Sequence, residues 1–250
     1  MLEPQDTINY RRDMTNKIPP LTRDGEPRAF FGRRVGKPLH GRQLTLVETL
    51  LPRLAVTLPE DGRLDPGTLF GFAPDGVELE IGYGGGEHLA RVAGERPRTG
   101  FIGAEVFSNG IGKMLEKIDA DGLENVRLYA DDALKLLQAL PDAALGGVHL
   151  LYPDPWPKTR HHKRRFISPT TLAELARTLR PGGFFRFATD IEDYADWGLA
   201  HVLRTPGFSW DHGAPASWHT PYAGWQATRY EQKARKQGRL RSWYFTFLRR

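Results

Sequence analysis

The sequence predicts an α/β fold, with a mostly parallel sheet covered by helices on both faces. Short apolar runs alternate with segments of helical periodicity from residue 77 onward. A glycine-rich turn follows the first of these runs, and acidic residues stand at the ends of later ones. The chain of 250 residues is long enough for one such domain with a sizeable core.

Residues 1–27 are rich in charged residues, asparagine and proline, and we expect them to form a flexible N-terminal arm before a single domain at 28–250. Residues 41–58 carry apolar side chains at helical spacing, interrupted by Pro52. Cysteine is absent, residues 1–12 lack the apolar stretch of a signal peptide, and no apolar run approaches a membrane span. We therefore expect a soluble, cytoplasmic protein without a membrane partner.

Residues 77–81 are the first predicted strand, and the glycine turn 82–86 separates it from a helical segment. This order is the first unit of a Rossmann-like nucleotide-binding sheet. Gly82 and Gly84 would let a ligand approach the backbone without meeting a Cβ. The turn departs from the dinucleotide fingerprint, because Glu87 stands where its third glycine is needed, and it lacks the ending of a P-loop. A purely structural turn is the alternative.

Glu105 lies near the end of the next predicted strand, 100–106, about 25 residues after Glu80. A carboxylate at this spacing meets ribose hydroxyls, because its oxygens accept from two neighbouring donors. Ser108 is then expected to cap a helix that runs to residue 121.

Two further strands also end in acids. Strand 125–130 is followed by Asp131 and Asp132, and one of these carboxylates could accept from an adenine amino group. For this pair the alternative is that Asp131 caps the following helix. Strand 184–188 leads to Asp190, which could equally cap the next helix.

An apolar strand at 148–152 ends in the loop Pro-Asp-Pro-Trp-Pro-Lys at 153–158. Its prolines fix φ and restrict the residues before them, so the loop is stiff before anything binds. Open α/β sheets place ligands at this end of their strands. The loop offers an acid, Asp154, a flat aromatic surface, Trp156, and a cation, Lys158; a simple turn with an aspartate cap is the alternative.

Basic residues concentrate in segments 28–42, 156–165 and 226–250. These segments carry net charges of +5, +5 and +7, or +17 against +5 for the whole chain, so the remainder carries −12. An acidic body with basic segments beside aromatic residues favours a nucleic-acid partner, provided that the segments meet on one face. Residues 228–231 add hydroxyl, guanidinium, aromatic and carboxylate groups suited to base and phosphate contacts, with an exposed charged helix as the alternative.

His161 and His162 are adjacent, and we interpret them as loop residues and expect no metal. Ser168 and Pro169 mark a helix start, with the serine as N-cap. Residues 208–211 and 243–248 are expected to complete the sheet as antiparallel strands.

Five motifs occur in a characteristic order: Glu80-Ile-Gly-Tyr-Gly-Gly-Gly, Gly103-Ala-Glu-Val, Pro153-Asp-Pro-Trp-Pro-Lys, Ala188-Thr-Asp and Thr228-Arg-Tyr-Glu. Over about residues 28–250 the chain resembles the bacterial tRNA (guanine-N7-)-methyltransferases, a family of class I S-adenosylmethionine-dependent enzymes. The Pro-Asp-Pro-Trp loop followed by His-x-Lys-Arg-Arg is specific to that family, whereas most methyltransferases share the glycine motif. Pro157 departs from the pattern, since the family often has histidine there.

The resemblance implies a Rossmann-like class I methyltransferase sheet, S-adenosylmethionine as the methyl donor, tRNA as the partner, and no required protein partner. It places these residues at the donor: Glu80, Gly82, Gly84, Glu105, Asp132 and Asp154. It places these at the tRNA: Lys158, Asp190, Thr228, Arg229, Tyr230 and Glu231. The methylated base would be a guanine of the variable loop, and Asp154 the catalytic residue.

Guanine N7 has a free lone pair, so no proton has to leave before it attacks a methyl group. Catalysis then rests mainly on positioning and charge stabilisation. Methylation makes the purine cationic, so Asp154 would orient the base and attract the developing charge. Methylation of an exocyclic amine, and a non-catalytic RNA-binding module, are the alternatives.

Overall fold

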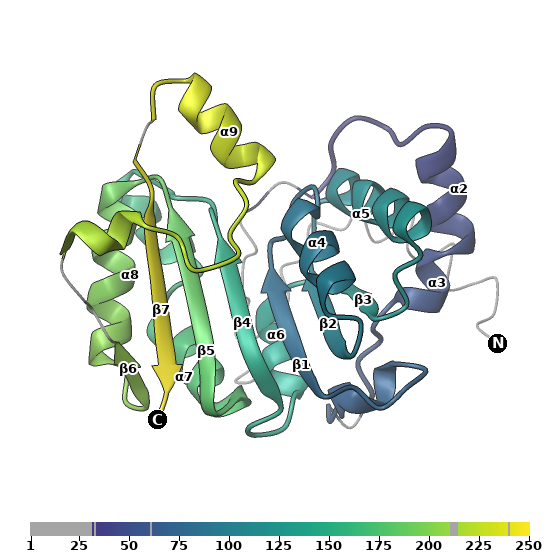
Figure 1. The fold of residues 1–250 in the computed structure, drawn as a ribbon, viewed down its shortest axis with the longest axis horizontal. Coiled ribbons are helices and arrows are strands. Elements are labelled where there is room, and N and C mark those ends of the chain that lie inside the picture. The colour runs from purple at the N-terminus through teal and green to yellow at the C-terminus, as the bar shows by residue number, and fades with distance from the viewer. Residues whose placement is uncertain (1–31, 33, 61, 211–214, 240) are drawn as a thin grey trace.

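The structure, a computed structural model, describes residues 32, 34–60, 62–210, 215–239 and 241–250, so the expected arm at 1–27 lies outside the described residues. One seven-stranded sheet has the order β3-β2-β1-β4-β5-β7-β6 (Figure 1). Its strands are β1 (Gly76–Ile81), β2 (Thr99–Ala104), β3 (Val126–Tyr129), β4 (Leu145–Leu151), β5 (Leu179–Thr189), β6 (Phe208–Trp210) and β7 (Trp243–Arg249). Strands β1 to β5 are parallel and β7 is antiparallel to both neighbours, as the sequence predicted.

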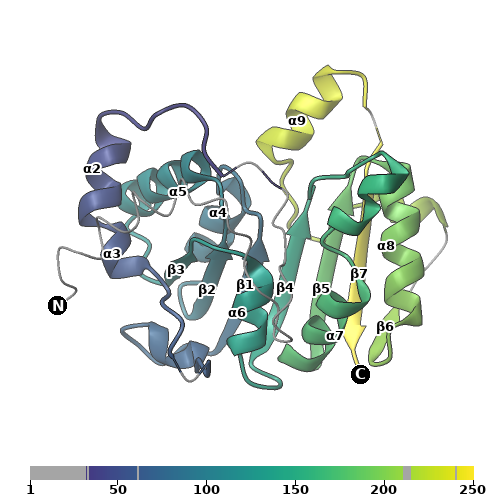
Figure 2. The same ribbon diagram turned by 180° about the vertical axis from the view of Figure 1, so that it is seen from behind.

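Helices cover both faces of the sheet, but not evenly. They are α2 (Arg42–Thr49), α3 (Leu51–Leu54), α4 (Glu87–Glu95), α5 (Ser108–Asp121), α6 (Ala133–Ala139), α7 (Pro169–Thr178), α8 (Glu192–Arg204) and α9 (Arg229–Lys236). Helices α6, α7 and α8 lie on one face (Figure 2), and α4 and α5 lie on the other beside β1 and β2 (Figure 1). Over β4, β5 and β7 this second face carries the chain that leads to α9, which includes the short 3-10 helix Pro215–His219 (Figure 1).

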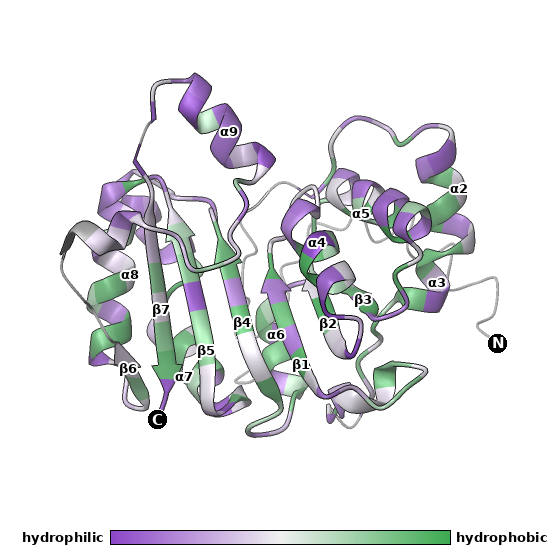
Figure 3. Ribbon diagram, viewed as in Figure 1, coloured by the Kyte–Doolittle hydropathy of each residue, from purple (hydrophilic) through white to green (hydrophobic). Residues whose placement is uncertain are grey.

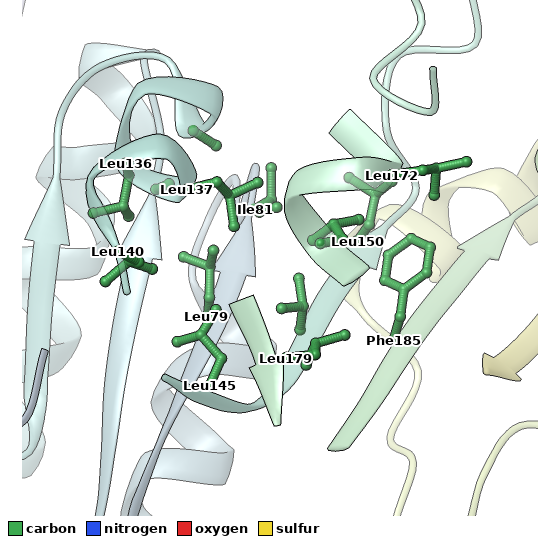
Figure 4. Close-up of a cluster of buried hydrophobic side chains, with 14 of the residues drawn as sticks. Leu79, Ile81, Leu136, Leu137, Leu140, Leu145, Leu150, Leu172, Leu179 and Phe185 are labelled. Carbon is green, nitrogen blue, oxygen red and sulfur yellow. The ribbon is translucent and has the colours of Figure 1, made fainter. Parts of the chain in front are cut away.

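The alternation of β1 explains how the main core forms. Val77, Leu79 and Ile81 point to one face and are buried against α6 and α7 (Figure 4). Glu78 and Glu80 point to the opposite face, where their carboxylates form hydrogen bonds with polar side chains. A second cluster packs α4 and α5 with α2 against β2 and β3. No helix in the described ranges is long and apolar enough to span a membrane.

Local predictions within the helices are partly corrected and partly confirmed. The predicted interruption of the helical segment 41–58 is confirmed: it divides at Leu50 into α2 and α3, because Pro52 fits only the first turn of a new helix. The helical structure ends at Leu54, earlier than expected. Ser108 does not cap α5; Phe107 is the N-cap, and the Ser108 N–H donates to the carbonyl of Arg34. The predicted cap of α7 is confirmed, since the Ser168 side chain accepts from the backbone N–H of Thr171.

Strand β5 begins earlier than residue 184, the predicted start. Leu179 already pairs with Leu145, and the register shifts before Gly147 pairs with Phe184. The shift accommodates the Pro181-Gly-Gly segment within the strand.

Candidate active site at the carboxyl edge of the sheet

Acidic side chains follow or end all five parallel strands, at the same edge of the sheet. They are Glu80 in β1, Glu105 after β2, Asp132 after β3, Asp154 after β4 and Asp190 after β5. The strand order reverses between β1 and β4, and open α/β sheets bind ligands at this switch point. The sequence-predicted donor residues therefore share one edge.

The glycine turn after β1 leaves an open backbone surface. Gly82 and Gly84 have φ values of +69° and +56°, in the left-handed region that glycine adopts without strain. A Cβ built on either residue would meet no described atom within 4 Å. The N–H of Gly84 donates to Oε2 of Glu105 over 2.9 Å, which ties the turn to the end of β2.

Glu105 is fixed by three backbone donors. Besides Gly84, the N–H groups of Val106 and Phe107 donate to Oε1 over 2.8 and 2.9 Å. Burial raises the pKa of Glu105 more than these hydrogen bonds lower it, and the negative charge of Asp154 raises it further. Because the charge of Asp154 acts on Glu105, the two carboxylates lie close enough to interact.

Asp132 and Asp131 have different structural tasks. Oδ1 of Asp132 accepts the N–H of Leu134 over 3.0 Å, so Asp132 caps α6 and is almost fully buried. Asp131, the alternative cap, instead pairs with Lys135 at 2.6 Å and Arg34 at 3.4 Å. The expectation that Asp131 could be the cap is wrong, because its carboxylate is turned toward these cations.

Two aromatic residues of the loop that carries Asp154 have an unusual backbone conformation. Tyr152 has φ of +51° and Trp156 has φ of +43°, which bulky residues rarely adopt. The N–H of Tyr152 donates to the carbonyl of Ala188 over 2.8 Å. The Asp154 residue is exposed at the surface. The protein atoms around its carboxyl group still remove part of its hydration, and this desolvation raises its pKa.

Arg165 supports the same loop through a hydrogen bond to its backbone. Its side chain is buried, its Nε–H donates to the carbonyl of Pro155 over 2.9 Å, and it forms an ion pair with Asp193. Its guanidinium lies over the rings of Tyr194 and Trp197 at 4.9 and 5.1 Å. Arg165 therefore supports the loop and is not an exposed cation of the basic segment.

Trp156 and Lys158 lie on the outer part of the loop. The guanidinium of Arg164 lies 5.0 Å from the Trp156 ring centroid, and His161 meets the ring edge-on at 6.0 Å. A base stacking on Trp156 would therefore share the ring with these residues. Lys158 is exposed and precedes a short 3-10 helix at Thr159–Arg164.

Two of the four residues at 228–231 build α9. Oγ1 of Thr228 accepts the N–H of Glu231 over 3.1 Å and caps the helix. The Glu231 side chain is buried and accepts from Nε1–H of Trp225 at 3.0 Å, the hydroxyl of Tyr244 at 2.8 Å and the guanidinium of Arg235. Glu231 thus anchors α9 to β7.

The other two residues face outward. Arg229 is exposed, and the Tyr230 ring packs 5.2 Å from that of Tyr152. Burial raises the pKa of Tyr230, and the charges of Asp190 and Asp154 add to the rise, so these groups are neighbours. Asp190 pairs with Arg239 at 2.7 Å. It is not the cap of α8, whose N-cap position is Ile191.

Sequence reasoning missed a buried polar layer on the second face of the sheet. Glu80 bonds to His88 of α4, and Glu78 bonds to His149 of β4 and Arg96. Burial favours a higher pKa for Glu78, but the hydrogen bonds from His149 and Arg96 hold it at about 2. Hydrophilic bands interrupt β1, β4 and β5 in Figure 3. Only the alternation of β1 signalled a polar face, because the partners are distant in sequence.

The sheet order, the antiparallel β7 and the acidic side chains at the carboxyl edge define a class I methyltransferase fold. A solved 16S rRNA methyltransferase, KamB, shares this fold with a TM-score of 0.51 and 21% identity, over 71% of this chain and 89% of that protein. Residues 75–242 also match the family described as "Putative methyltransferase".

Two relatives specify the family. The tRNA (guanine-N(7)-)-methyltransferase of Brucella anthropi is 51% identical over 95% of this chain and 100% of its own length. The enzyme of that name from Nitrobacter hamburgensis is 47% identical over 98% of this chain and 95% of its own length. The chain belongs to the tRNA (guanine-N7-)-methyltransferase family.

Proposed function

We propose that this protein transfers the methyl group of S-adenosylmethionine to N7 of a guanine in the variable loop of tRNA. The observation that carries the proposal is the shared carboxyl edge, where an open glycine turn, fixed carboxylates and an exposed basic helix adjoin. The family of the chain supports the same reaction.

The residues of the edge fit the methyl donor. The open space over Gly82 and Gly84 admits a ligand against the backbone. Glu105 is held in place by N–H donors and has the acceptor capacity for ribose hydroxyls, and Asp132, after the neighbouring strand β3, would accept from the adenine amino group. S-adenosylmethionine supplies a methyl group bound to a sulfonium centre, an electrophile that guanine N7 can attack.

Asp154 would act on the guanine. Its loop is held by Arg165 and by the backbone of Tyr152, so the carboxylate is positioned before the RNA binds. It would accept from the N1–H and amino group of the base, and its charge would stabilise the purine as it becomes cationic. No proton transfer to Asp154 is needed.

The RNA contacts would come from both sides of this carboxylate. Lys158 is exposed on the loop and Arg229 on α9, and both suit phosphate contacts. Tyr230 is partly exposed between Asp190 and Asp154 and offers a surface for stacking. Thr228 and Glu231 would act by fixing α9, since their side chains are used within the protein.

The test is incubation of the protein with labelled S-adenosylmethionine and unmodified tRNA, followed by nucleoside analysis and mapping of the modified position. We expect 7-methylguanosine at one guanine of the variable loop. N2-methylguanosine or N6-methyladenosine would show that an exocyclic amine is the acceptor. RNA binding without any transfer would leave a binding module.

A further inference from the structure

A chain of two hydrogen bonds leads from the buried Glu80 at the end of β1 to Tyr222 in the segment before α9. Oε2 of Glu80 lies 2.6 Å from Nδ1 of His88, and Nε2 of His88 lies 2.6 Å from the hydroxyl of Tyr222. Glu80 and His88 are 3% and 4% exposed. The contact between His88 and Tyr222 joins residues 134 positions apart.

The three groups are linked by complementary polar atoms. The Glu80 carboxylate accepts from Nδ1–H of His88, and Nε2 of His88 shares a hydrogen bond with the Tyr222 hydroxyl. Burial raises the pKa of Tyr222 to about 12, although Arg186 opposes the rise, so this hydroxyl stays protonated. Each polar atom of the histidine ring is therefore satisfied.

Tyr222 is also fixed from its other sides. The guanidinium of Arg186, on β5, lies 3.7 Å from the ring centroid, and Trp225 meets the ring edge-on at 5.3 Å. Nε1–H of Trp225 donates to Glu231, the buried anchor of α9. The segment that carries Tyr222 and Trp225 passes in front of β7 and β5 before it enters α9 (Figure 1).

We propose that His88 and Tyr222 are positioning residues that couple the methyl-donor pocket to the RNA-binding helix α9. His88 lies in the first turn of α4, directly after the glycine turn, and Glu80 precedes that turn in β1. A ligand on the turn that fixes Glu80 and His88 would also fix Tyr222, Trp225 and so α9. The inference rests on the proposed donor and tRNA sites.

The test measures coupling between the two ligands, which a merely structural role would not abolish selectively. The affinity for unmodified tRNA is measured with and without saturating S-adenosylhomocysteine, in the wild type and in Tyr222→Phe. In the wild type we expect the donor analogue to tighten tRNA binding by about fivefold or more, the lower end of usual coupling. Tyr222→Phe keeps the ring but removes the hydroxyl, so the factor should fall to about one, while the affinity for S-adenosylhomocysteine alone is kept.

Thr178→Val is the matched control. It removes another buried hydroxyl, which donates to the carbonyl of Glu174 within α7 on the opposite face, and should leave the coupling factor unchanged. A wild type without coupling, or Tyr222→Phe with full coupling, would overturn the inference. Failure of the wild type to bind S-adenosylhomocysteine at all would instead contradict the proposed function.

Discussion

At the scale of single residues, Asp154 combines a solvent-open carboxylate with a rigid support, and its charge can be removed without disturbing that support. We expect Asp154→Asn to lower kcat by roughly a hundredfold, because removal of one electrostatic contact to a transition state typically costs this much. The affinities for S-adenosylmethionine and tRNA should stay within about twofold of the wild type. Single-turnover methylation and equilibrium binding measure the two quantities separately.

Asp142→Asn is the matched control for the loss of one carboxylate charge. Asp142 is exposed between α6 and β4, at the opposite edge of the sheet, where it pairs with Arg177 at 2.8 Å. Its substitution should leave kcat unchanged. Equal kcat values for Asp154→Asn and the wild type would remove Asp154 from the chemistry.

We expect the buried His149 to make the stability of the protein depend on pH. Burial lowers its pKa below the ordinary value of 6.5, the nearby His88 lowers it further, and the hydrogen bond to Glu78 opposes the shift, as does the charge of Glu80. Below about pH 6.5 His149 binds a proton in the unfolded chain but stays neutral in the folded protein until a lower pH. The free energy of unfolding therefore falls as the pH falls. One such group contributes a slope of at most about 1.4 kcal/mol per pH unit. Glu78 adds little to this slope between pH 7 and pH 5, because most of its own contribution is lost only as the pH falls through and below its ordinary pKa of 4.5.

The slope is measured by urea unfolding at pH 7, 6 and 5. His149→Gln should flatten it, whereas His40→Gln, at an exposed position, should leave it unchanged. An equal slope for the wild type and His149→Gln would show that the proton uptake belongs to other groups.

At the scale of elements, α9 depends on one buried carboxylate. Glu231→Ala would leave the donors of Trp225 and Tyr244 without their acceptor, at a cost of about 1.5–3 kcal/mol. We expect amide hydrogen exchange in α9 to accelerate by roughly ten- to a hundredfold, and tRNA binding to weaken. Donor binding should persist, because the glycine turn is a separate element.

Arg235→Ala separates anchoring from charge. Arg235 also pairs with Glu231, but its side chain is 57% exposed, and pairs of this kind contribute at most about 1 kcal/mol. Its loss should change exchange in α9 much less than the loss of Glu231. Similar exchange in both variants would mean that the ion pair, and not the buried acceptor, holds the helix.

Elements with local signals were predictable from the sequence, and those that depend on distant partners were not. The alternation of Val77 to Ile81, the glycine turn and the Ser168 cap act over a few residues, and the structure has all three. Asp132 and Asp131 offered the same cap chemistry, and only Lys135 and Arg34 decide between them. The chain segment that carries Tyr222 has no periodic pattern, because side-chain contacts with β5 and α4 hold it in place.

At the scale of the whole molecule, some cations of the basic segments 156–165 and 226–250 lie away from the site or are buried. Arg249, in β7, ends at the edge opposite the site, where it donates to the carbonyl of Ala176. Arg165 is buried under the Asp154 loop. The exposed cations on the loop and α9 are Lys158, Arg160, Lys163, Arg229, Lys233, Arg235 and Lys236, and Arg235 among them pairs with Glu231. Figure 3 shows α9 as hydrophilic along most of its length.

This exposed set predicts how tRNA affinity responds to salt. Each phosphate contact releases condensed counterions, so its loss lowers the slope of log K against log salt by about one unit or slightly less. We expect Lys163→Ala, beyond the loop, and Lys236→Ala, at the end of α9, each to reduce the slope by this amount. The two changes together should reduce it by about two units, because the residues belong to separate elements.

Arg98→Ala tests whether position or net charge matters. Arg98 is 74% exposed and pairs with Asp75 before β1 and β2 begin, at the edge opposite the site. The variant changes the net charge as much as either lysine substitution but should leave the slope unchanged, since slopes count contacts and not overall charge. If all three variants lower the slope equally, the RNA is held by the general field of the protein. If only the lysine variants do, the RNA lies across the carboxyl edge, along the loop and α9.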